Sequence, residues 1–290
     1  MSFRADFKWG AATAAYQIEG AAEVGGRKPS VWDMHCRREG AIWRKQSGAE
    51  ACDHYHHFRE DVAIMKQFGF NAYRFSASWS RVIPDGKGAV NPQGLAFYDQ
   101  LVDELLASGI EPYLTLFHWD FPLELYYQGG WLNSDSPKWF ADYAQLMADK
   151  LGDRVSNWMT HNEPQCFVSI GHQSGIHGPG DKVPFRELVR IMHHVLVSHV
   201  LGTQAIRASC PKPVKVGIAP AVAAFAPASE SEAEIEAART ATWATSGKSA
   251  FGNSWWLDPI VLGQYPEDGK ALFGDDFCSA YENDLATIKQ

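Results

Sequence analysis

Hydrophobic positions along the chain alternate between two spacings, and this alternation predicts a repeated strand–helix unit. Phe58, Val62 and Met65 lie three or four positions apart, which predicts a helix that begins near residue 53 and ends near Gly69. The short run at 71–76 that follows has the length and composition of a strand. A helix followed by a short strand is therefore the first unit of the pattern.

The same unit returns three more times. Asn91 and Pro92 are typical N-cap and first-turn residues of a helix that Gly109 ends, and a strand is expected at 112–117. The later pairs of helix and strand are expected at about 139–152 with 155–160, and at about 185–208 with 214–219. With an opening strand at 7–13, the pattern predicts five parallel strands joined by four crossovers.

Two architectures fit this alternation, a doubly wound sheet and a (β/α)₈ barrel. No G-x-G-x-x-G or G-x-x-x-x-G-K string follows a predicted strand, so a dinucleotide or P-loop site has no support. Polar residues gather instead just after the strand ends, where the active site of a barrel lies: Ser76 and Ser78, His118 and Asp120, Asn162 and Glu163.

Composition and charge exclude several classes of protein. The 290 residues are 46% apolar with a formal net charge of −8, which disfavours a nucleic-acid partner. Five widely spaced cysteines argue against a disulfide framework, and the absence of any C-x-x-C string argues against a zinc ribbon. The sequence has neither a long apolar stretch nor a signal-peptide pattern at its start. We therefore expect a cytoplasmic protein without a membrane partner.

The histidines near the first helix do not predict a metal site. Asp53, His54, His56 and His57 crowd together in the sequence, as zinc ligands do. On a helix, however, His54 and His57 share a face, and His56 points elsewhere. We interpret these histidines as ordinary helix residues, and no metal or organic cofactor is expected.

Glu163 is the strongest candidate for chemistry. It follows the strand at 155–160, stands beside an amide and before a proline, and has apolar neighbours in the sequence. A carboxyl kept protonated in such surroundings can donate a proton to a leaving group and later act as a base. On composition alone, a glutamate at a strand end is more often an ordinary solvated residue, because most charged residues are exposed. The string around Glu163 changes that balance.

The strings around these residues resemble glycoside hydrolase family 1, the β-glucosidase family, along the whole chain. The N-terminal run at 7–20 is similar to that family's signature, and further matches follow in the family's order. They are Asp53-His54-Tyr55, Tyr73-Arg74-Phe75-Ser76, Phe117-His118-Trp119-Asp120, Gly130-Trp131-Leu132, Asn162-Glu163-Pro164 and the segment at 253–259. The resemblance implies a (β/α)₈ barrel, of which this chain supplies about the first five units.

The resemblance also implies roles for individual residues. Gln17 and His118 would hydrogen-bond hydroxyls of the non-reducing sugar, Asn162 would hold the 2-hydroxyl, and Trp119 would line the same subsite. For Gln17 a surface amide, and for Trp119 simple packing, are the structural alternatives.

Two further residues would take part in the reaction itself. The resemblance makes Glu163 the acid/base and places Arg74 near the nucleophilic carboxylate, where its charge would keep that group ionised. A purely structural ion pair is the alternative for Arg74.

The chain departs from the family at the nucleophile. A retaining mechanism needs two carboxyl groups about 5 to 5.5 Å apart. The family's second one lies in a Thr-Glu-Asn-Gly string, which does not occur here. Tyr281-Glu282-Asn283-Asp284 is only superficially similar, and we assign Glu282 no catalytic role. Five strands are present where a barrel needs eight, so we expect 1–290 to be a partial catalytic domain that a second polypeptide segment completes.

Smaller departures surround Glu163. His161 stands where the family usually has an aromatic or aliphatic residue. It either perturbs Glu163, contacts an unusual substrate, or is a core-facing histidine with a backbone hydrogen-bond partner. Gln165 and Cys166 replace the usual aromatic after the proline, on the side of the leaving group. Farther along, Ser229 and Glu232 resemble a capping box that opens the next helix.

These observations lead to one functional hypothesis and one competitor. The first is a retaining β-glycosidase acting on terminal non-reducing β-D-glycosides by double displacement. β-Glucosides are the expected substrates, and β-galactosides and β-fucosides are further candidates. The competitor is a catalytically incomplete sugar-binding or scaffold fragment without a nucleophile. A transglycosylase and a phospho-sugar glycosidase are nearer rivals that the sequence leaves open.

Overall fold

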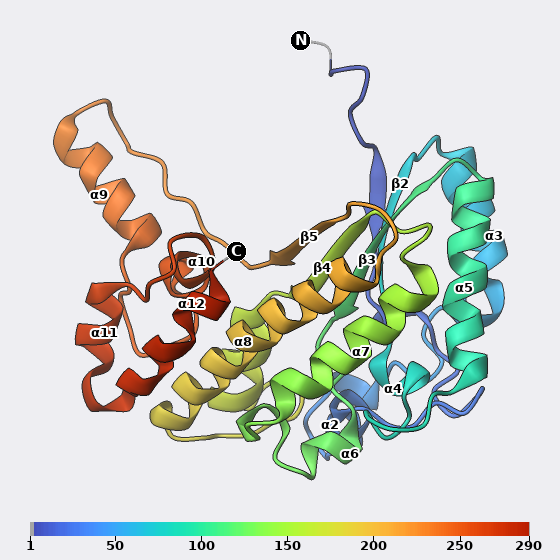
Figure 1. Cartoon of the computed structure of the whole chain (residues 1–290), viewed down its shortest axis with the longest axis horizontal. Coiled ribbons are helices and arrows are strands. Elements are labelled where there is room, and N and C mark those ends of the chain that lie inside the picture. Colours follow the sequence, from blue (N-terminus) through green and yellow to red (C-terminus); the bar gives the residue numbers. More distant parts are fainter. Residues whose placement is uncertain (1–2, 290) are drawn as a thin grey trace.

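The computed structural model describes residues 3–289, and its centre is a five-stranded, fully parallel sheet (Figure 1). The strands are Gly10–Ala12 (β1), Ala72–Ser76 (β2), Glu111–Phe117 (β3), Asn157–Asn162 (β4) and Lys215–Ala219 (β5). They pair in the order β1-β2-β3-β4-β5. A doubly wound sheet reverses its strand order, whereas a barrel keeps it sequential. The chain is therefore the first five units of a (β/α)₈ barrel.

Four long helices connect these strands and cover the outer face of the sheet (Figure 1). Each carries an apolar stripe that packs against the sheet or a neighbouring helix, and residues such as Val102, Leu114 and Val195 are fully buried between the layers. The four helices are His54–Gln67 (α3), Pro92–Ala107 (α5), Ser136–Leu151 (α7) and Phe185–Ser209 (α8).

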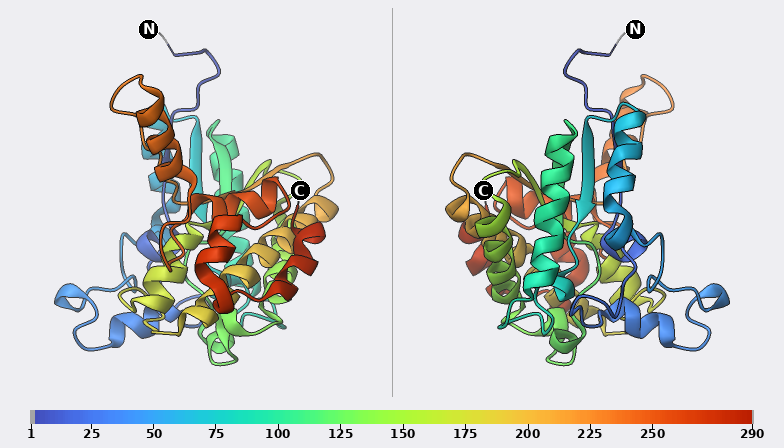
Figure 2. Two further views of the ribbon diagram at one scale, coloured as in Figure 1. Left: turned by 90° about the vertical axis from the view of Figure 1, so that its left-hand side faces the viewer. Right: turned by 90° about the vertical axis from the view of Figure 1, so that its right-hand side faces the viewer.

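The segments around this frame form shorter helices. Figure 2 shows that the segment between α2 and α3 projects from the sheet, while Figure 1 shows α10, α11 and α12 gathered near one end of α8 and α9 projecting away from them. These elements are Ala15–Ile18 (α1), Val31–Arg37 (α2), Trp43–Lys45 (η1), Trp79–Val82 (α4), Leu123–Tyr126 (α6), Gly130–Leu132 (η2), Cys166–Gln173 (η3, a π-helix), Glu232–Trp243 (α9), Asn253–Val261 (α10), Glu267–Phe273 (α11), Gly274–Asp276 (η4), Ser279–Asp284 (η5) and Leu285–Ile288 (α12).

Most predicted elements are confirmed, and α5 shows why. The side chain of Asn91 accepts a hydrogen bond from the amide of Gln93, and Pro92 begins the helix. Gly109, just after the end of the helix, has a left-handed φ of +75°. Within residues 3–289, no helix has the length and apolar character that crossing a membrane requires.

Three predicted boundaries are wrong. β1 is limited to Gly10–Ala12, and Phe7 and Trp9 before it are exposed and pack on each other. Trp9 O still accepts from the amides of Asn71 and Ala72, so the chain leaves the regular ladder at this point. β4 begins and ends two residues later than predicted, since the amide of Val155 still donates to the carbonyl of Leu151, the last residue of α7. The N-cap of α9 is not Ser229.

Ser231 caps α9 instead. Its hydroxyl accepts a hydrogen bond from the amide of Glu234 at 3.3 Å, and Glu232 is the first helical residue rather than the third. Among the described residues Ser229 Oγ forms hydrogen bonds with Ser231 alone, so the predicted capping box has the right helix and the wrong serine.

Candidate active site

Arg74 connects three neighbouring strands at their carboxyl-terminal ends. From β2, its Nε donates to Thr115 Oγ1 on β3 at 3.0 Å, and its Nη2 donates to Asn162 Oδ1 on β4 at 2.5 Å. Burial lowers the pKa of the Arg74 guanidinium, while the nearby charge of Glu163 opposes that shift. The cation thus holds the amide of Asn162 in place and lies within electrostatic reach of the next residue.

Glu163 leaves β4 in a strained backbone conformation. Its φ is +45°, a left-handed value that costs a residue with a side chain about 1 to 3 kcal/mol. The strain is held by two backbone hydrogen bonds, because its amide donates to Ala219 O at 2.7 Å and its carbonyl accepts from the amide of Cys166 at 2.9 Å. Its side chain is half-buried, so the carboxyl stays accessible at the rim.

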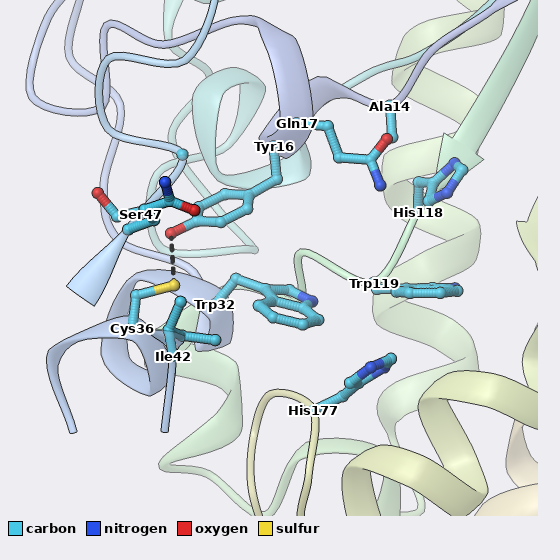
Figure 3. Close-up of a pocket in the computed structure, with 12 residues that line it drawn as sticks. Ala14, Tyr16, Gln17, Trp32, Cys36, Ile42, Ser47, His118, Trp119 and His177 are labelled. Atoms are coloured by element: carbon cyan, nitrogen blue, oxygen red, sulfur yellow. Dashed lines mark hydrogen bonds between the residues drawn. The ribbon is translucent and has the colours of Figure 1, made fainter. Parts of the chain in front are cut away.

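Three of the predicted residues line one cavity of about 420 Å³ beside this rim (Figure 3). Gln17 enters from α1, and His118 and Trp119 come from the loop after β3. Arg74, Asn162 and Glu163 do not line this cavity. The structure therefore brings the six predicted residues together as two adjoining groups of three.

Trp119 joins the two groups. It also has a left-handed φ, +78°, which turns its indole so that Nε1 donates to the backbone oxygen of Asn162 at 2.8 Å. The ring face lies toward the cavity, stacked on Trp32 with 6.5 Å between ring centroids (Figure 3). The cavity wall is thus bonded directly to the strand end that carries Glu163.

His118 presents an uncharged imidazole to the cavity. Burial and the positive charge of Arg74 lower its pKa to about 4. Its Nδ1 is buried and has no hydrogen-bond partner among the described residues. A neutral ring offers one donor and one acceptor, which suits a ligand hydroxyl.

Sequence reasoning missed the aromatic side of the cavity. Tyr16, Trp32, Cys36 and His177 line it, although they come from three separate segments of the chain (Figure 3). The Tyr16 hydroxyl donates to Cys36 Sγ at 3.5 Å, and burial raises the pKa of the Cys36 thiol. Tyr16 stands next to Gln17 in the recognised N-terminal run, and that adjacency was the one available signal.

A buried charged network lies behind the cavity and was also missed. The carboxylate of Glu19 accepts hydrogen bonds from Arg81 Nε at 2.9 Å and from the Tyr98 hydroxyl at 2.6 Å. Burial raises the pKa of Asp120 to about 7, while the charge of Arg27 opposes the shift. These groups are enclosed, so they support the loops after β1, β2 and β3 rather than face the cavity.

The histidines near α3 and the acidic C-terminal string lie elsewhere. His54 Nδ1 is 2.6 Å from Asp61 Oδ2, His56 pairs with the N-cap residue Asp53, and His57 pairs with the exposed Glu60. Within residues 3–289, no group of three His, Cys, Asp or Glu side chains is arranged to hold a metal ion. Glu282 is exposed and pairs with Lys270 at 2.9 Å, away from the strand ends.

Gln165 and Cys166 lie where the chain turns from β4 into η3. Gln165 is fully buried, and its Oε1 accepts from the amide of Ala221, after β5, at 3.0 Å. Burial and the adjacent Glu163 carboxylate raise the pKa of the Cys166 thiol to about 12. The arrangement therefore offers a half-buried carboxyl for proton transfer, a neutral imidazole and an amide for hydroxyls, and aromatic faces for apolar ring surfaces.

Comparison with known proteins gives a consistent result. The model of glycosyl hydrolase family 1 matches residues 1–290. A β-glucosidase of Agrobacterium sp. (strain ATCC 21400) is 41% identical over 288 residues, which is 99% of this chain and 61% of that relative. β-Glucosidase A of Acetivibrio thermocellus is 41% identical over 293 residues and covers 100% of this chain and 63% of its own length.

Solved structures agree with these matches. Virulence factor SghA from Agrobacterium tumefaciens superposes with a TM-score of 0.89 at 41% identity, over 99% of this chain and 62% of that one. A β-glucosidase from Thermotoga maritima, solved with deoxynojirimycin, superposes with a TM-score of 0.89 at 37% identity, over 99% and 63%. The chain spans less than two thirds of the length of these relatives.

Proposed function

The chain belongs to glycosyl hydrolase family 1, and from this membership we propose that it is part of a retaining β-glycosidase whose acid/base is Glu163. The activity proposed is hydrolysis of terminal non-reducing β-D-glycosides, with β-glucosides as first substrates and β-galactosides and β-fucosides as further ones. One observation carries the proposal: the half-buried Glu163 directly follows Asn162 at a barrel strand end, and Trp119, which lines the cavity, donates a hydrogen bond to Asn162 O.

The first half of the reaction breaks the glycosidic bond. A nucleophilic carboxylate attacks the anomeric carbon while Glu163 donates its proton to the departing glycosidic oxygen, which leaves as an alcohol. In the second half, Glu163 takes a proton from water, the water oxygen attacks the anomeric carbon, and the nucleophile is released. Glu163 thus begins and ends the cycle protonated.

The remaining predicted residues would bind the sugar and the nucleophile. Gln17 and the neutral His118 line the cavity and would hydrogen-bond sugar hydroxyls, with Trp119 beside them. Asn162 would hold the 2-hydroxyl, a contact that strengthens in the transition state. Arg74, already bonded to Asn162, would keep the nucleophile ionised.

We further propose that residues 1–290 are the first part of a catalytic domain, and that a second polypeptide segment completes the barrel and supplies the nucleophilic Glu. The open edge strand β5 supports this, since its five residues are exposed or half-buried, unlike those of β2. A cytoplasmic location stays a prediction from the sequence.

One observation favours the competing function, a sugar-binding or scaffold fragment without turnover. Glu282, in the string most similar to the family's nucleophile motif, is paired with Lys270 outside the cavity. Under this alternative the cavity binds a sugar and nothing is hydrolysed.

The test combines this chain with a supplied C-terminal part. The chain would be mixed or fused with the portion of the Agrobacterium β-glucosidase that lies beyond its match, and hydrolysis of 4-nitrophenyl β-D-glucoside would be measured. We expect turnover only in the combination, and Glu163→Gln should lower it by at least about a hundredfold. Glu282→Gln is the matched control and should change nothing.

Azide gives the sharper result. In Glu163→Ala, azide should restore turnover of an activated aryl glucoside, because it needs no base to attack the glycosyl-enzyme. If Glu163→Gln kept full activity, Glu163 would not be the acid/base. If the unmutated combination folded and bound sugar without turnover, the scaffold alternative would replace the proposal.

A further inference from the structure

β4 contains an extra residue just before the candidate acid/base. Its pairing with β5 runs from Met159 opposite Gly217 to Asn162 opposite Ala219, which is three steps along β4 against two along β5. Such a bulge redirects the side chains that follow it, because successive residues of a regular strand point to opposite faces. The direction of Asn162 is therefore set by what holds the bulge.

Two hydrogen bonds from α8 hold it. Thr160 Oγ1 lies 2.7 Å from His199 Nδ1, and His161 Nε2 lies 2.9 Å from Ser198 Oγ. Thr160 and His161 are adjacent in the strand, yet both reach the same helix, which only the bulge permits. Asn162 then turns to the opposite face, where Arg74 binds it.

His161 occupies a closed aromatic box. Its ring is fully buried and lies 4.4 Å from the ring of Phe140, 5.6 Å from that of Trp131 and 5.7 Å from that of Phe117, measured between centroids. A phenylalanine ring would fit these aromatic surroundings as well as the imidazole does. What a phenylalanine would lack is the one hydrogen bond that His161 forms. That bond is the one to Ser198.

The donor and acceptor in this bond can be assigned. The Ser198 hydroxyl donates its own proton to Val195 O at 2.7 Å, so Ser198 Oγ must accept from His161 Nε2–H. Nδ1 then carries no proton, which agrees with its having no partner among the described residues. Burial and the neighbouring His199 lower the pKa of His161, so the ring is neutral.

We propose that His161, through its hydrogen bond to Ser198, is a positioning residue for Asn162 and Glu163. The bond ties the bulge of β4 to α8 from behind, while Trp119 Nε1 ties the backbone oxygen of Asn162 from the cavity side. The inference rests on the proposed function only for its catalytic consequence. Its structural part concerns this chain alone.

Four variants separate the hydrogen bond from packing. Ser198→Ala removes the acceptor, and His161→Phe keeps a ring in the box without the donor. His161→Gln keeps a donor near the position of Nε2. Thr203→Val is the matched control, since Thr203 is also buried on α8 but its hydroxyl bonds only His199 O within the helix.

Two measurements decide the matter. Nitrogen NMR of the chain with labelled histidine should show the Nε2–H form of His161. In uniformly labelled chain, Ser198→Ala should move the amide resonances of Asn162 and Glu163, whereas Thr203→Val should not. In the combined enzyme, Ser198→Ala and His161→Phe should each lower kcat about tenfold with KM within about twofold, and His161→Gln should recover most of the loss.

The double variant tests the coupling. Ser198→Ala should have no further effect on kcat in the His161→Phe background, since the bond is already gone. The inference is overturned if kcat stays unchanged while thermal stability falls, or if the two amide resonances do not move. Without turnover in the unmutated combination, the proposed catalysis fails, and the NMR result alone still upholds or overturns the positioning.

Discussion

Two consecutive strand–helix units of this chain differ sharply in burial. The unit formed by β4 and α8 carries Asn162 and Glu163, and thirteen of the 25 residues of α8 are buried. The next unit, β5 and α9, has one buried residue in its helix, Ala238, and no buried residue in its strand. The first unit is packed from both faces, whereas the second lies at the edge of an open barrel. Position in the barrel, rather than element type, therefore decides how rigidly a residue is held.

The largest contrast is expected for cavity-creating substitutions. Leu196 on α8 is fully buried, and Leu196→Ala should lower the free energy of unfolding by about 2 to 5 kcal/mol. Ile235 on α9 is 40% exposed, and Ile235→Ala should cost less than about 1 kcal/mol. Urea denaturation followed by circular dichroism measures both. Equal losses would mean that α9 is packed as tightly as α8.

The stability of the β4–α8 unit should depend on pH because His199 is buried on α8. Burial and the charge of Arg207 lower its pKa to about 4 in the folded chain, against about 6.5 when unfolded. Below about 6.5 only the unfolded chain takes up the proton, so stability falls as the pH drops toward 4 and then levels off. The loss amounts to about 3 kcal/mol.

His199→Asn isolates this contribution. The amide nitrogen of asparagine can take the place of Nδ1 beside Thr160 but does not titrate. Between about pH 6.5 and 4, the slope of the free energy of unfolding against pH should therefore lose the contribution of one proton. Asp120, whose folded pKa is about 7, acts with the opposite sign in both proteins and cancels in the comparison. The β5–α9 unit contains no histidine, so it contributes no such slope. An unchanged pH profile would contradict the assignment.

The same difference explains what the sequence could predict. Helices such as α5 and α8 have strong apolar periodicity, and α5 is also capped by Asn91, so their existence and approximate bounds follow from the pattern. The motifs also place Gln17, His118 and Trp119 in one cavity. The N-cap of α9 is predicted wrongly in the weakly packed unit, where Ser229 and Ser231 have equal claims to the cap position by sequence alone.

Other features depend on contacts between distant segments, which no local pattern contains. The bulge in β4 requires Ser198 and His199, almost forty residues away, and the bond from Trp119 to Asn162 O spans 43 positions. The cavity walls Trp32 and His177 meet only in the folded chain. Sequence reasoning therefore named the candidate reacting residues and missed the contacts that hold them in place.

Glycine substitutions provide an intermediate test. At Gly202 on α8, an added Cβ would lie 2.6 Å from the buried ring of Phe140 on α7, so Gly202→Ala should cost about 1 to 3 kcal/mol. At Gly217 on β5 an added Cβ meets nothing within 4 Å, and Gly217→Ala should be neutral or stabilise by up to about 1 kcal/mol. Chemical denaturation of both variants gives the sign directly. Destabilisation by Gly217→Ala would show that the edge is already covered.

The smallest expected effect concerns the cap of α9. Ser231→Ala removes the acceptor for the Glu234 amide and should weaken α9 by about 1 kcal/mol. Because this helix packs so little against the rest, the loss should appear as faster hydrogen exchange of α9 amides, with the global unfolding transition unchanged. Ser229→Ala is the control, since Ser229 caps no amide of the helix, and it should leave exchange nearly unaltered. If Ser229→Ala had the larger effect, the capping box expected from the sequence would be right after all. If Ser231→Ala lowered global stability, α9 would fold as one unit with the β4–α8 layer.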